Sequence, residues 1–297
     1  ITVTVNPKPV LPAQAETICS GGTFTLTPAN AQPTTIIPTG TTYTWTVVDN
    51  PNVTGESDQA SPQSSISQTL TNATNQSQQV VYTVTPTSGA QGGCVGSPFT
   101  LTVTISPKPT VQDTTTAICS GATFTVTPTG GNGNIVPVGT TYIWTFTNNP
   151  NVSGEAVNNT QSASITGTLT NNTNQVQTVV YTVTPSVNGA CAGNTFTVTV
   201  TVNPKPVIPA QSQTICSEGT FTVSPVDNGS TTIVPSNTTY TWTVATNTNV
   251  SGQSAQATPQ SSISQTLTNL TNVTQTVVYT VTPTSGAQGS CVGNTFT

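Results

Sequence analysis

The sequence contains no histidine and no methionine, and only three of its 297 residues are basic. All three are lysines, so arginine is missing as well. Histidine is the most frequent general base and metal ligand in proteins, and no Ser-His-Asp triad can form without it. Three positive charges are too few to neutralise a nucleic-acid backbone or to hold the chain on acidic lipids. We therefore predict a protein that is not an enzyme, uses no cofactor or metal and binds no nucleic acid.

Charged side chains of either sign are scarce. They make up 4% of the residues, against about 25% in an average soluble domain. Long apolar runs are also missing, because no stretch approaches the ~20 residues that span a bilayer, and we expect no direct membrane insertion. What is present is threonine, valine and isoleucine with evenly spaced aromatic residues, a composition that favours β-strands.

The chain repeats itself. A Pro-Lys-Pro segment occurs three times, at spacings of 100 and 97 residues, and cysteine, tryptophan and tyrosine recur after each one. A period of this length is that of a whole domain. We predict that residues 1–6 are the last strand of a preceding or donated repeat, and that the repeats are 7–106, 107–203 and 204–297, the third lacking most of its last strand. The predicted junction residues are Pro7, Lys8, Pro9, Pro107, Lys108, Pro109, Pro204, Lys205 and Pro206.

The two ends of the chain match parts of one motif. Residues 294–297 match the start of segment 194–206, and residues 1–9 match its remainder without a gap. Two interpretations follow: the chain is a window of a longer array, or Ile1–Val5 completes the third repeat of a neighbouring molecule by strand addition. The expected partners are therefore further copies of the same repeat, in the same or a neighbouring chain.

Each repeat shows short stretches of alternating apolar and polar residues separated by proline, glycine, asparagine and serine. In the first repeat we expect strands at 23–27, 43–47, 66–70, 80–85 and 99–105. A tryptophan in the third strand, and a tyrosine placed as in a tyrosine corner, fit an immunoglobulin-like sandwich. The predicted fold class is all-β, with three tandem immunoglobulin-like β-sandwich domains in a linear array. The predicted core residues are Phe24, Trp45, Tyr82, Phe124, Trp144, Tyr181, Phe221, Trp242 and Tyr279.

Six cysteines recur as two per repeat, which predicts disulfides and an oxidising, extracellular location. Pairing within each repeat is the default for tandem domains, and each bond would be worth about 4 kcal/mol in the chain-entropy model. A straight first strand would instead carry its cysteine to the far end of the repeat, which favours bonds between neighbouring repeats. We favour the pairs Cys19–Cys94, Cys119–Cys191 and Cys216–Cys291, with the alternative pairs Cys19–Cys191 and Cys119–Cys291.

Acidic residues form no repeated site. Glu56 and Asp58 lie close together, but the second repeat has only Glu155 there and the third has Gln253. A paired-carboxylate glycosidase site would need both groups, so we interpret this segment as a solvated loop.

Four recurring segments carry a family resemblance. They are Thr-Ile-Cys-Ser-Gly-Gly-Thr-Phe-Thr at 17–25, Thr-Tyr-Thr-Trp-Thr at 42–46, Val-Val-Tyr-Thr-Val-Thr-Pro at 80–86 and the Pro-Lys-Pro junctions. Together they resemble the PKD-like repeats of giant secreted surface proteins of Bacteroidota, the class of SprB-type gliding-motility adhesins. The resemblance covers the whole chain and implies PKD-like β-sandwich domains, type IX secretion, display on the cell surface and a stalk or filament that carries adhesive contacts.

These observations together predict a non-catalytic structural segment of a long extracellular adhesin or surface filament, which acts as a disulfide-stabilised stalk. Two alternatives remain. One is an array of carbohydrate-binding modules that binds surface glycans through exposed loop aromatics. The other is a pilus-like subunit that polymerises by β-strand donation.

Overall fold

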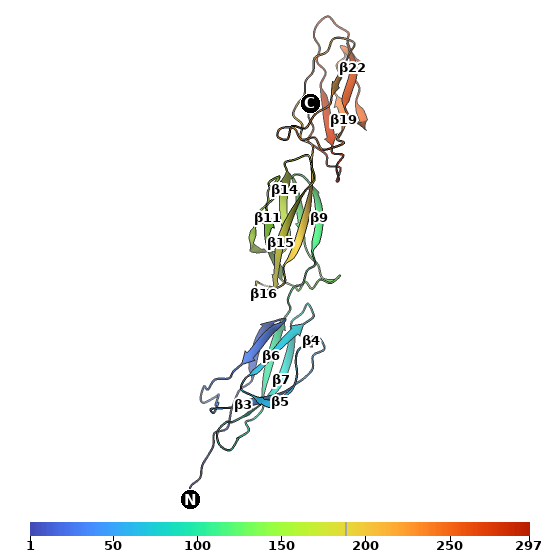
Figure 1. Ribbon diagram of the computed structural model, residues 1–297. Coiled ribbons are helices and arrows are strands. Elements are labelled where there is room, and N and C mark those ends of the chain that lie inside the picture. The colour runs from blue at the N-terminus through green and yellow to red at the C-terminus, as the bar shows by residue number, and fades with distance from the viewer. Residues whose placement is uncertain (188) are drawn as a thin grey trace. The chain divides into compact units, whose positions relative to one another are not determined.

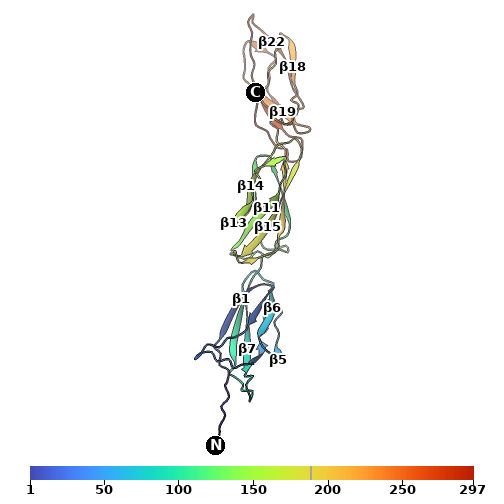
Figure 2. The ribbon, with the colours of Figure 1, turned by 60° about the vertical axis from the view of Figure 1, so that its left-hand side comes forward.

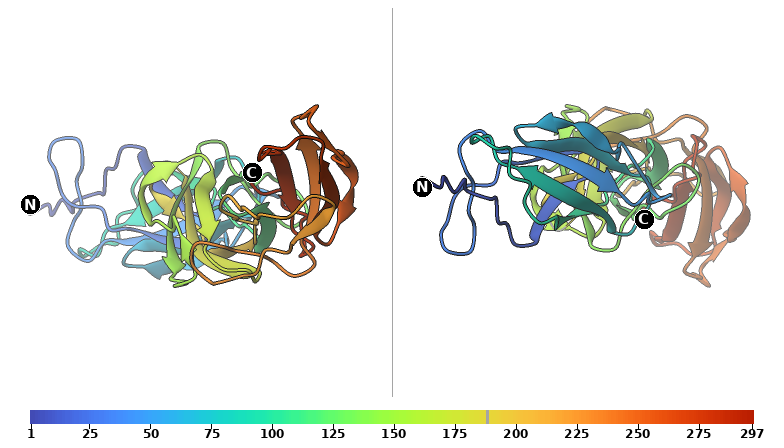
Figure 3. Two further views of the ribbon diagram at one scale, coloured as in Figure 1. Left: turned by 90° about the horizontal axis from the view of Figure 1, so that it is seen from above. Right: turned by 90° about the horizontal axis from the view of Figure 1, so that it is seen from below.

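The computed structural model describes residues 1–187 and 189–297. Within these ranges the chain forms strands, turns and loops without a helix, as both views of Figure 3 show, which confirms the predicted all-β class. The described residues accordingly offer no helix able to cross a membrane. Contacts between Cα atoms divide the chain into two compact units, namely 1–112 with 128–142 and 184–195, and 113–127 with 143–183 and 196–297.

The first repeat packs one sheet on another. The larger sheet has the order β1-β8-β7-β3-β5, and the smaller has the order β2-β6-β4. β1 runs parallel to β8, whereas the other pairs are antiparallel. Figures 1 and 2 show these strands, with the N-terminal segment running away from them. The bounds are β1 Gln14–Cys19, β2 Gly22–Leu26, β3 Thr42–Val47, β4 Val53–Thr54, β5 Gln59–Gln63, β6 Ile66–Asn72, β7 Gln78–Thr87 and β8 Phe99–Ser106.

The alternating sequence pattern explains the core of this repeat. Val80, Tyr82 and Val84 point inward from β7 and are at most 1% exposed, because successive side chains of a strand point to opposite faces. Trp45 on β3 lies opposite Val84 and donates its indole N–H to the carbonyl oxygen of Ser57 at 3.1 Å. The buried valine occupies the place of a core cysteine, so the sandwich has no disulfide between its two sheets.

The tyrosine does not form a tyrosine corner, and this expectation was wrong. The hydroxyl of Tyr82 donates to Oε1 of Gln68 on β6 at 2.8 Å, and Tyr279 donates to Gln265 at 2.7 Å in the third repeat. The ring lies inside the sandwich, so its hydroxyl reaches the opposite sheet rather than the nearby backbone. The tyrosine thus links the two sheets.

The second repeat has the same architecture. Its larger sheet has the order β13-β11-β15-β17-β9 with β16 added to β15, and its smaller sheet has the order β10-β14-β12. β9 runs parallel to β17, as β1 does to β8. The bounds are β9 Thr114–Cys119, β10 Ala122–Val126, β11 Thr140–Thr147, β12 Val152–Ser153, β13 Asn158–Ser162, β14 Ile165–Asn171, β15 Gln177–Val187, β16 Cys191–Ala192 and β17 Phe196–Asn203.

The third repeat has fewer strands. Its sheets have the orders β18-β22-β20 and β21-β19-β23. Residues 211–216, which correspond to β1 and β9, form no strand, and only Phe296 and Thr297 correspond to β8 and β17. The bounds are β18 Gly219–Val223, β19 Thr239–Val244, β20 Val250–Ser251, β21 Gln256–Gln260, β22 Ile263–Asn269 and β23 Tyr279–Thr284.

Candidate functional site: the disulfide-linked junctions

The disulfides connect consecutive repeats. Cys19 of the first repeat is bonded to Cys191 of the second, and Cys119 of the second is bonded to Cys291 of the third. The Cα atoms of the two pairs are 5.5 and 5.6 Å apart, within the usual range for disulfides. The favoured pairing within each repeat is therefore wrong, and the alternative pairs between neighbouring repeats are the ones present.

The parallel first strand is the physical reason for this pairing. β1 runs beside β8 in register from Gln14 opposite Leu101 to Cys19 opposite Ser106. The backbone N–H of Ser20 then donates to the carbonyl oxygen of Ser106 at 2.9 Å. Cys19 thus lies where β8 ends and the chain leaves for the next repeat, far along the sheet from Cys94.

The partner cysteine lies in a loop that packs against the junction proline. Cys191 pairs with Val187 in the short hairpin β15–β16, and Gly193 donates its N–H to the carbonyl oxygen of Pro185 at 2.8 Å. A Cβ atom on Gly193 would lie 2.2 Å from the carbonyl oxygen of Pro109, closer than real Cβ contacts. Glycine therefore lets this loop approach the Pro-Lys-Pro segment and presents Cys191 to Cys19.

The second disulfide has the same surroundings. Cys119 ends β9 opposite Asn203 at the end of β17, and Sγ of Cys291 lies 4.0 Å from the carbonyl oxygen of Asn203. A Cβ atom on Gly289 would lie 2.6 Å from Nδ2 of Asn203. Asn203 is 5% exposed, so this asparagine lies buried beside the bond.

The junction residues are more buried than an exposed hinge would be. Pro9, Pro109 and Pro206 are all buried. Lys108 and Lys205 are half-buried and Lys8 and Pro7 are exposed, while Pro107 and Pro204 are buried. Nζ of Lys205 donates to Oδ1 of Asn294 at 3.1 Å. Of the three junction lysines, Lys8 alone is exposed.

Two cysteines remain free. Cys94 of the first repeat is half-buried, and Cys216 of the third is exposed. By its place in the repeat, Cys94 corresponds to Cys191 and Cys291. Cys216 corresponds in the same way to Cys19 and Cys119. The sequence analysis did not single them out, because the favoured pairing within each repeat uses all six cysteines. The signal for them was present, since bonds between neighbours leave one unpaired cysteine in each terminal repeat.

The aromatic residues face the interior. Trp45, Trp144 and Trp242 are 6%, 7% and 6% exposed. The other predicted core residues are buried as well, except Phe221 and Tyr279, which are half-buried against the third core. None of the sixteen aromatic residues, all of which lie in the described ranges, is classed as exposed. Stacking of a sugar needs an accessible ring face, so the carbohydrate-binding alternative gains no support.

Glutamates occupy one half-buried loop position in the first two repeats. Oε1 of Glu155 accepts a hydrogen bond from the N–H of Asn149 at 3.1 Å. Burial raises the pKa of the Glu155 carboxyl, and this hydrogen bond lowers it in part. Oε1 of Glu56 accepts from Asn50 at 3.2 Å, while its buried Oε2 has no partner. Among the described residues no cluster of three or more potential metal ligands occurs.

One family model matches most of the chain, in three consecutive segments. A family model described as PKD-like domain matches residues 16–109, 114–206 and 213–297. No curated protein sequence matches.

The similar solved structures contain several domains in one chain. They include an E-to-A variant of three immunoglobulin domains of titin (12% identity, 96% of this chain and 95% of that chain covered, TM-score 0.31). Domains FN1 to FN3 of chicken CNTN1 have 13% identity, 97% and 96% coverage and a TM-score of 0.29. Drosophila N-cadherin EC1-4 has 11% identity, 97% and 73% coverage and a TM-score of 0.24. Likenesses this distant carry nothing about function.

Proposed function

The chain belongs to the family of PKD-like domains, and from this premise we propose that it is a non-catalytic structural segment of a long extracellular adhesin or surface filament. It acts as a stalk in which each disulfide ties one repeat to the next. The observation that carries the proposal is the pairing of Cys19 with Cys191 and of Cys119 with Cys291. A bond across a junction does little for the core of one domain, but it resists separation of two.

The composition suits this role. Disulfides persist in oxidising compartments outside the cytosol. The solvent-facing sides of the strands carry threonine and serine, whose hydroxyls pair across the strands instead of forming ion pairs, as in Thr23–Thr69 at 2.6 Å and Thr123–Thr168 at 2.7 Å. A chain in which 4% of the residues are charged attracts nucleic acid, acidic lipid and other proteins weakly. Such a segment can hold the binding region of a long protein away from the cell to which the protein is attached, without binding other molecules itself.

The test is surface exposure of the native protein together with the state of its cysteines. Antibodies raised against the chain should label intact, unpermeabilised cells of the source organism. A membrane-impermeant maleimide should leave Cys19, Cys119, Cys191 and Cys291 unmodified until a reductant is added. Labelling that requires permeabilisation, or ready modification of these four thiols, would contradict the proposal.

The adhesive role needs a separate experiment. Deleting the segment from the native polypeptide should reduce the attachment of cells under shear flow, because the segment holds the binding region away from the cell. The affinity of the purified binding region for its target should not change, because the segment takes no part in recognition. We also propose type IX secretion and a link to gliding motility, on the resemblance to SprB-type adhesins. Surface labelling that persists in a strain without type IX secretion would contradict the proposed secretion route. Unchanged gliding of the strain that lacks the segment would contradict the proposed link to motility.

A further inference from the structure

One sequence triplet recurs at two places in every repeat. It is Asn-x-Ser/Thr with a residue other than proline in the middle, the acceptor of N-linked glycans in secreted proteins. The first place holds the triplets that begin at Asn52, Asn151 and Asn249, and the second holds those that begin at Asn72, Asn171 and Asn269. A threonine-rich chain contains such triplets by chance, so their accessibility decides which of them an enzyme can reach.

A tight turn presents the first triplet to solvent. The N–H of Val53 donates to the carbonyl oxygen of Asn50 at 2.8 Å, which closes a four-residue turn with Asn52 in its third position. Thr54 follows in β4. Asn52 and Thr54 are both exposed, whereas Val53 between them is 5% exposed. The two groups that the triplet needs, the side-chain amide and the hydroxyl, are therefore accessible from solvent.

The turn is the same in the other repeats. The N–H of Val152 donates to the carbonyl oxygen of Asn149 at 2.9 Å, and that of Val250 donates to Asn247 at 3.0 Å. Both valines are 7% exposed. The polar residues of these two triplets are all exposed, namely Asn151, Ser153, Asn249 and Ser251. An accessible acceptor triplet thus occurs at this turn in each repeat.

The fold makes little use of the two exposed groups. Nδ2 of Asn52 lies 3.5 Å from Oε1 of Gln78, and the equivalent atoms are 3.4 Å apart in the other repeats, beyond the usual N–H···O range. The hydroxyls of Thr54, Ser153 and Ser251 take part in no hydrogen bond within the part of the chain that the structure describes. Hydrogen bonding therefore does not explain why a hydroxyl residue follows this turn in every repeat.

The second triplet lies next to the first and differs from it in burial. Val53 is opposite Asn72 where β4 pairs with β6. Nδ2 of Asn72 donates to the carbonyl oxygens of Gln76 at 2.7 Å and Ile105 at 3.1 Å. Its Oδ1 accepts from the N–H and the hydroxyl of Thr74, each at 2.8 Å. Asn72 is 4% exposed, so its amide is buried and fully hydrogen-bonded, and no sugar fits on it.

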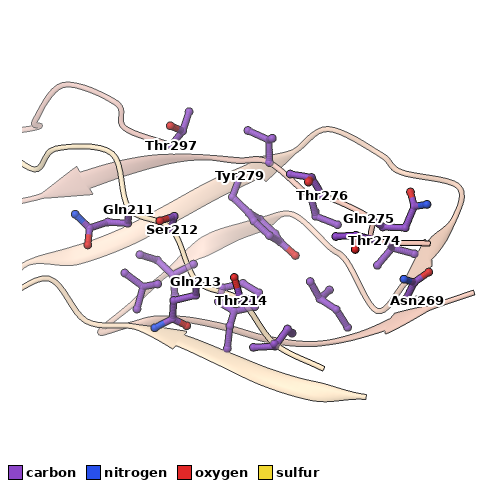
Figure 4. Close-up of a pocket in the computed structure, with 18 of the residues that line it drawn as sticks. Gln211, Ser212, Gln213, Thr214, Asn269, Thr274, Gln275, Thr276, Tyr279 and Thr297 are labelled. Carbon is purple, nitrogen blue, oxygen red and sulfur yellow. The ribbon is translucent and has the colours of Figure 1, made fainter. Parts of the chain in front are cut away.

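The other repeats show the same contrast. Asn171 is 2% exposed, and its Nδ2 donates to the carbonyl oxygens of Gln175 at 2.6 Å and Val202 at 3.0 Å. Asn269 is half-buried, and Figure 4 shows it toward the same end of the third repeat as Gln275. Because Gln275 faces the first triplet of its repeat, the two triplets lie close together there as well. Accessibility separates two places that share one sequence pattern.

We propose that Asn52, Asn151 and Asn249 each carry an N-linked glycan, whereas Asn72 and Asn171 carry none. The inference goes beyond the stalk role, because it assigns a covalent modification and its attachment sites. It shares with that role only the extracellular location, since the stalk itself rests on the disulfides.

The attachment is a group transfer from a polyprenyl pyrophosphate that carries an oligosaccharide. Nδ2 of the asparagine forms a bond with C1 of the first sugar, and the bond between C1 and the phosphate oxygen breaks. The pyrophosphate leaves with the electron pair, and one amide proton passes to a base of the transferase. A transferase that acts on the folded chain needs an exposed amide and an exposed hydroxyl, which the first triplet provides and the buried second triplet does not.

A glycan at this turn would cover a strand edge. β4 is an outer strand of the smaller sheet. Unpaired strand edges tend to pair with other chains, and proteins often protect them with charged residues. Only 4% of the residues are charged here, and neither Val53 nor Thr54 is among them. A bulky, hydrated glycan beside β4 supplies this protection instead.

The first test is mass spectrometry of the native polypeptide from its source. Every lysine of the segment precedes a proline, where trypsin cleaves poorly, so chymotrypsin is used. It cuts after Trp45, Leu70 and Tyr82 and thereby separates Asn52 from Asn72. Electron-transfer fragmentation, which leaves a glycan on its side chain, should place one on Asn52 and on the first triplet of the other two repeats. Asn72 should be unmodified.

Point variants of the native polypeptide test the role of the triplet. Thr54→Val removes the hydroxyl and keeps the shape of the side chain, so it should lower the glycosylated fraction of Asn52 at least tenfold. Thr54→Ser is the matched control and should retain the glycan, since the other two repeats have serine there. The glycans on Asn151 and Asn249 should not change. Because the Thr54 side chain is exposed, neither variant should unfold, and an unchanged melting temperature checks this.

Three results would overturn the inference. They are unmodified Asn52, Asn151 and Asn249 in the native protein, equal glycosylation of Asn72, and a glycan on Asn52 that persists in Thr54→Val. Antibody labelling of intact cells tests the extracellular location separately. Labelled cells whose three asparagines are unmodified would therefore contradict the glycosylation alone and leave the stalk role standing.

Discussion

Glu155 and Gln253 occupy equivalent positions with different chemistry. Oε1 of Gln253 accepts from the N–H of Asn247 at 3.2 Å, and its Nε2 donates to the carbonyl oxygens of Asn247 and Val250 at 2.6 and 3.1 Å. Both carboxylate oxygens of Glu155 face only the N–H of Asn149, at 3.1 and 3.3 Å. An ionised carboxylate cannot donate to the carbonyl groups that the glutamine amide reaches.

We predict that Glu155→Gln stabilises the second repeat at pH 7 by about 1 kcal/mol, since a neutral amide replaces a half-buried charge and gains hydrogen bonds. Because the folded-state pKa of Glu155 is raised, protonation favours the folded state. This contribution is fully present below the ordinary value of 4.5 and is lost as pH rises through the raised pKa. Hydrogen exchange of residues 165–187 in the full chain, measured between pH 4 and pH 8, gives the local free energy.

The reciprocal change, Gln253→Glu, is the control and should destabilise the third repeat at pH 7 while leaving residues 165–187 unaffected. A Glu155→Gln variant whose second repeat opens more readily than the wild type at pH 7 would contradict this prediction. The Glu155 carboxylate, half-buried and bonded to one N–H group, would then stabilise the repeat better than the amide does.

At the scale of elements, a glycine sets the path of the chain after β12. Gly154 has φ +93°, and a Cβ atom there would lie 2.1 Å from the carbonyl oxygen of Thr168 on β14. Gly55 and Gly252 show the same close approach, to Thr69 and Thr266. Only glycine combines this backbone conformation with such a contact.

Gly154→Ala should therefore destabilise the second repeat by about 3 kcal/mol, because the backbone must leave a left-handed region and β14 must move. Gly130→Ala is the matched control, since a Cβ atom there has nothing within 4 Å, and it should be neutral. Thermal unfolding of the two full-length variants, followed by tryptophan fluorescence, measures the difference. Equal melting temperatures of the two variants would show that the loop after β12 accommodates the added methyl group without a loss of stability.

The strands expected in the first repeat at 23–27, 43–47, 66–70, 80–85 and 99–105 appear as β2, β3, β6, β7 and β8, within about two residues at most ends. They were predictable because each alternates apolar and polar residues. β4 and β5 were not, because Val53–Thr54 is short and Gln59–Gln63 contains no large apolar residue. Those two strands exist through pairing with β6 and β3, which local sequence does not encode.

At the scale of the molecule, the disulfides interlock along the sequence, since Cys119 lies between Cys19 and Cys191, and Cys191 lies between Cys119 and Cys291. A force applied to the two ends of the fully unfolded chain passes from Cys19 to Cys191, back along the chain to Cys119 and then to Cys291. This path contains about 96 residues at ~3.6 Å each, or about 35 nm, against about 107 nm for the reduced chain.

We predict these two contour lengths in single-molecule stretching of the oxidised and the reduced protein. Cys191→Ser should give about 45 nm, since only the Cys119–Cys291 bond then shortens the path. The double variant Cys94→Ser, Cys216→Ser should behave as the wild type. An oxidised chain that extends to the reduced length would contradict the disulfide connectivity.

Composition and periodicity alone determined that this protein is an all-β array of similar domains without histidine chemistry, because alternation and repetition are properties of neighbouring residues. The disulfide pairing was decided only by tertiary structure. The parallel register of β1 on β8 carries Cys19 to the exit of its repeat, and the glycine-rich loop at Gly193 brings Cys191 to meet it. The free thiols of Cys94 and Cys216 follow from the same register. Which strand ends meet depends on contacts across about 170 residues of chain, which no local pattern reports.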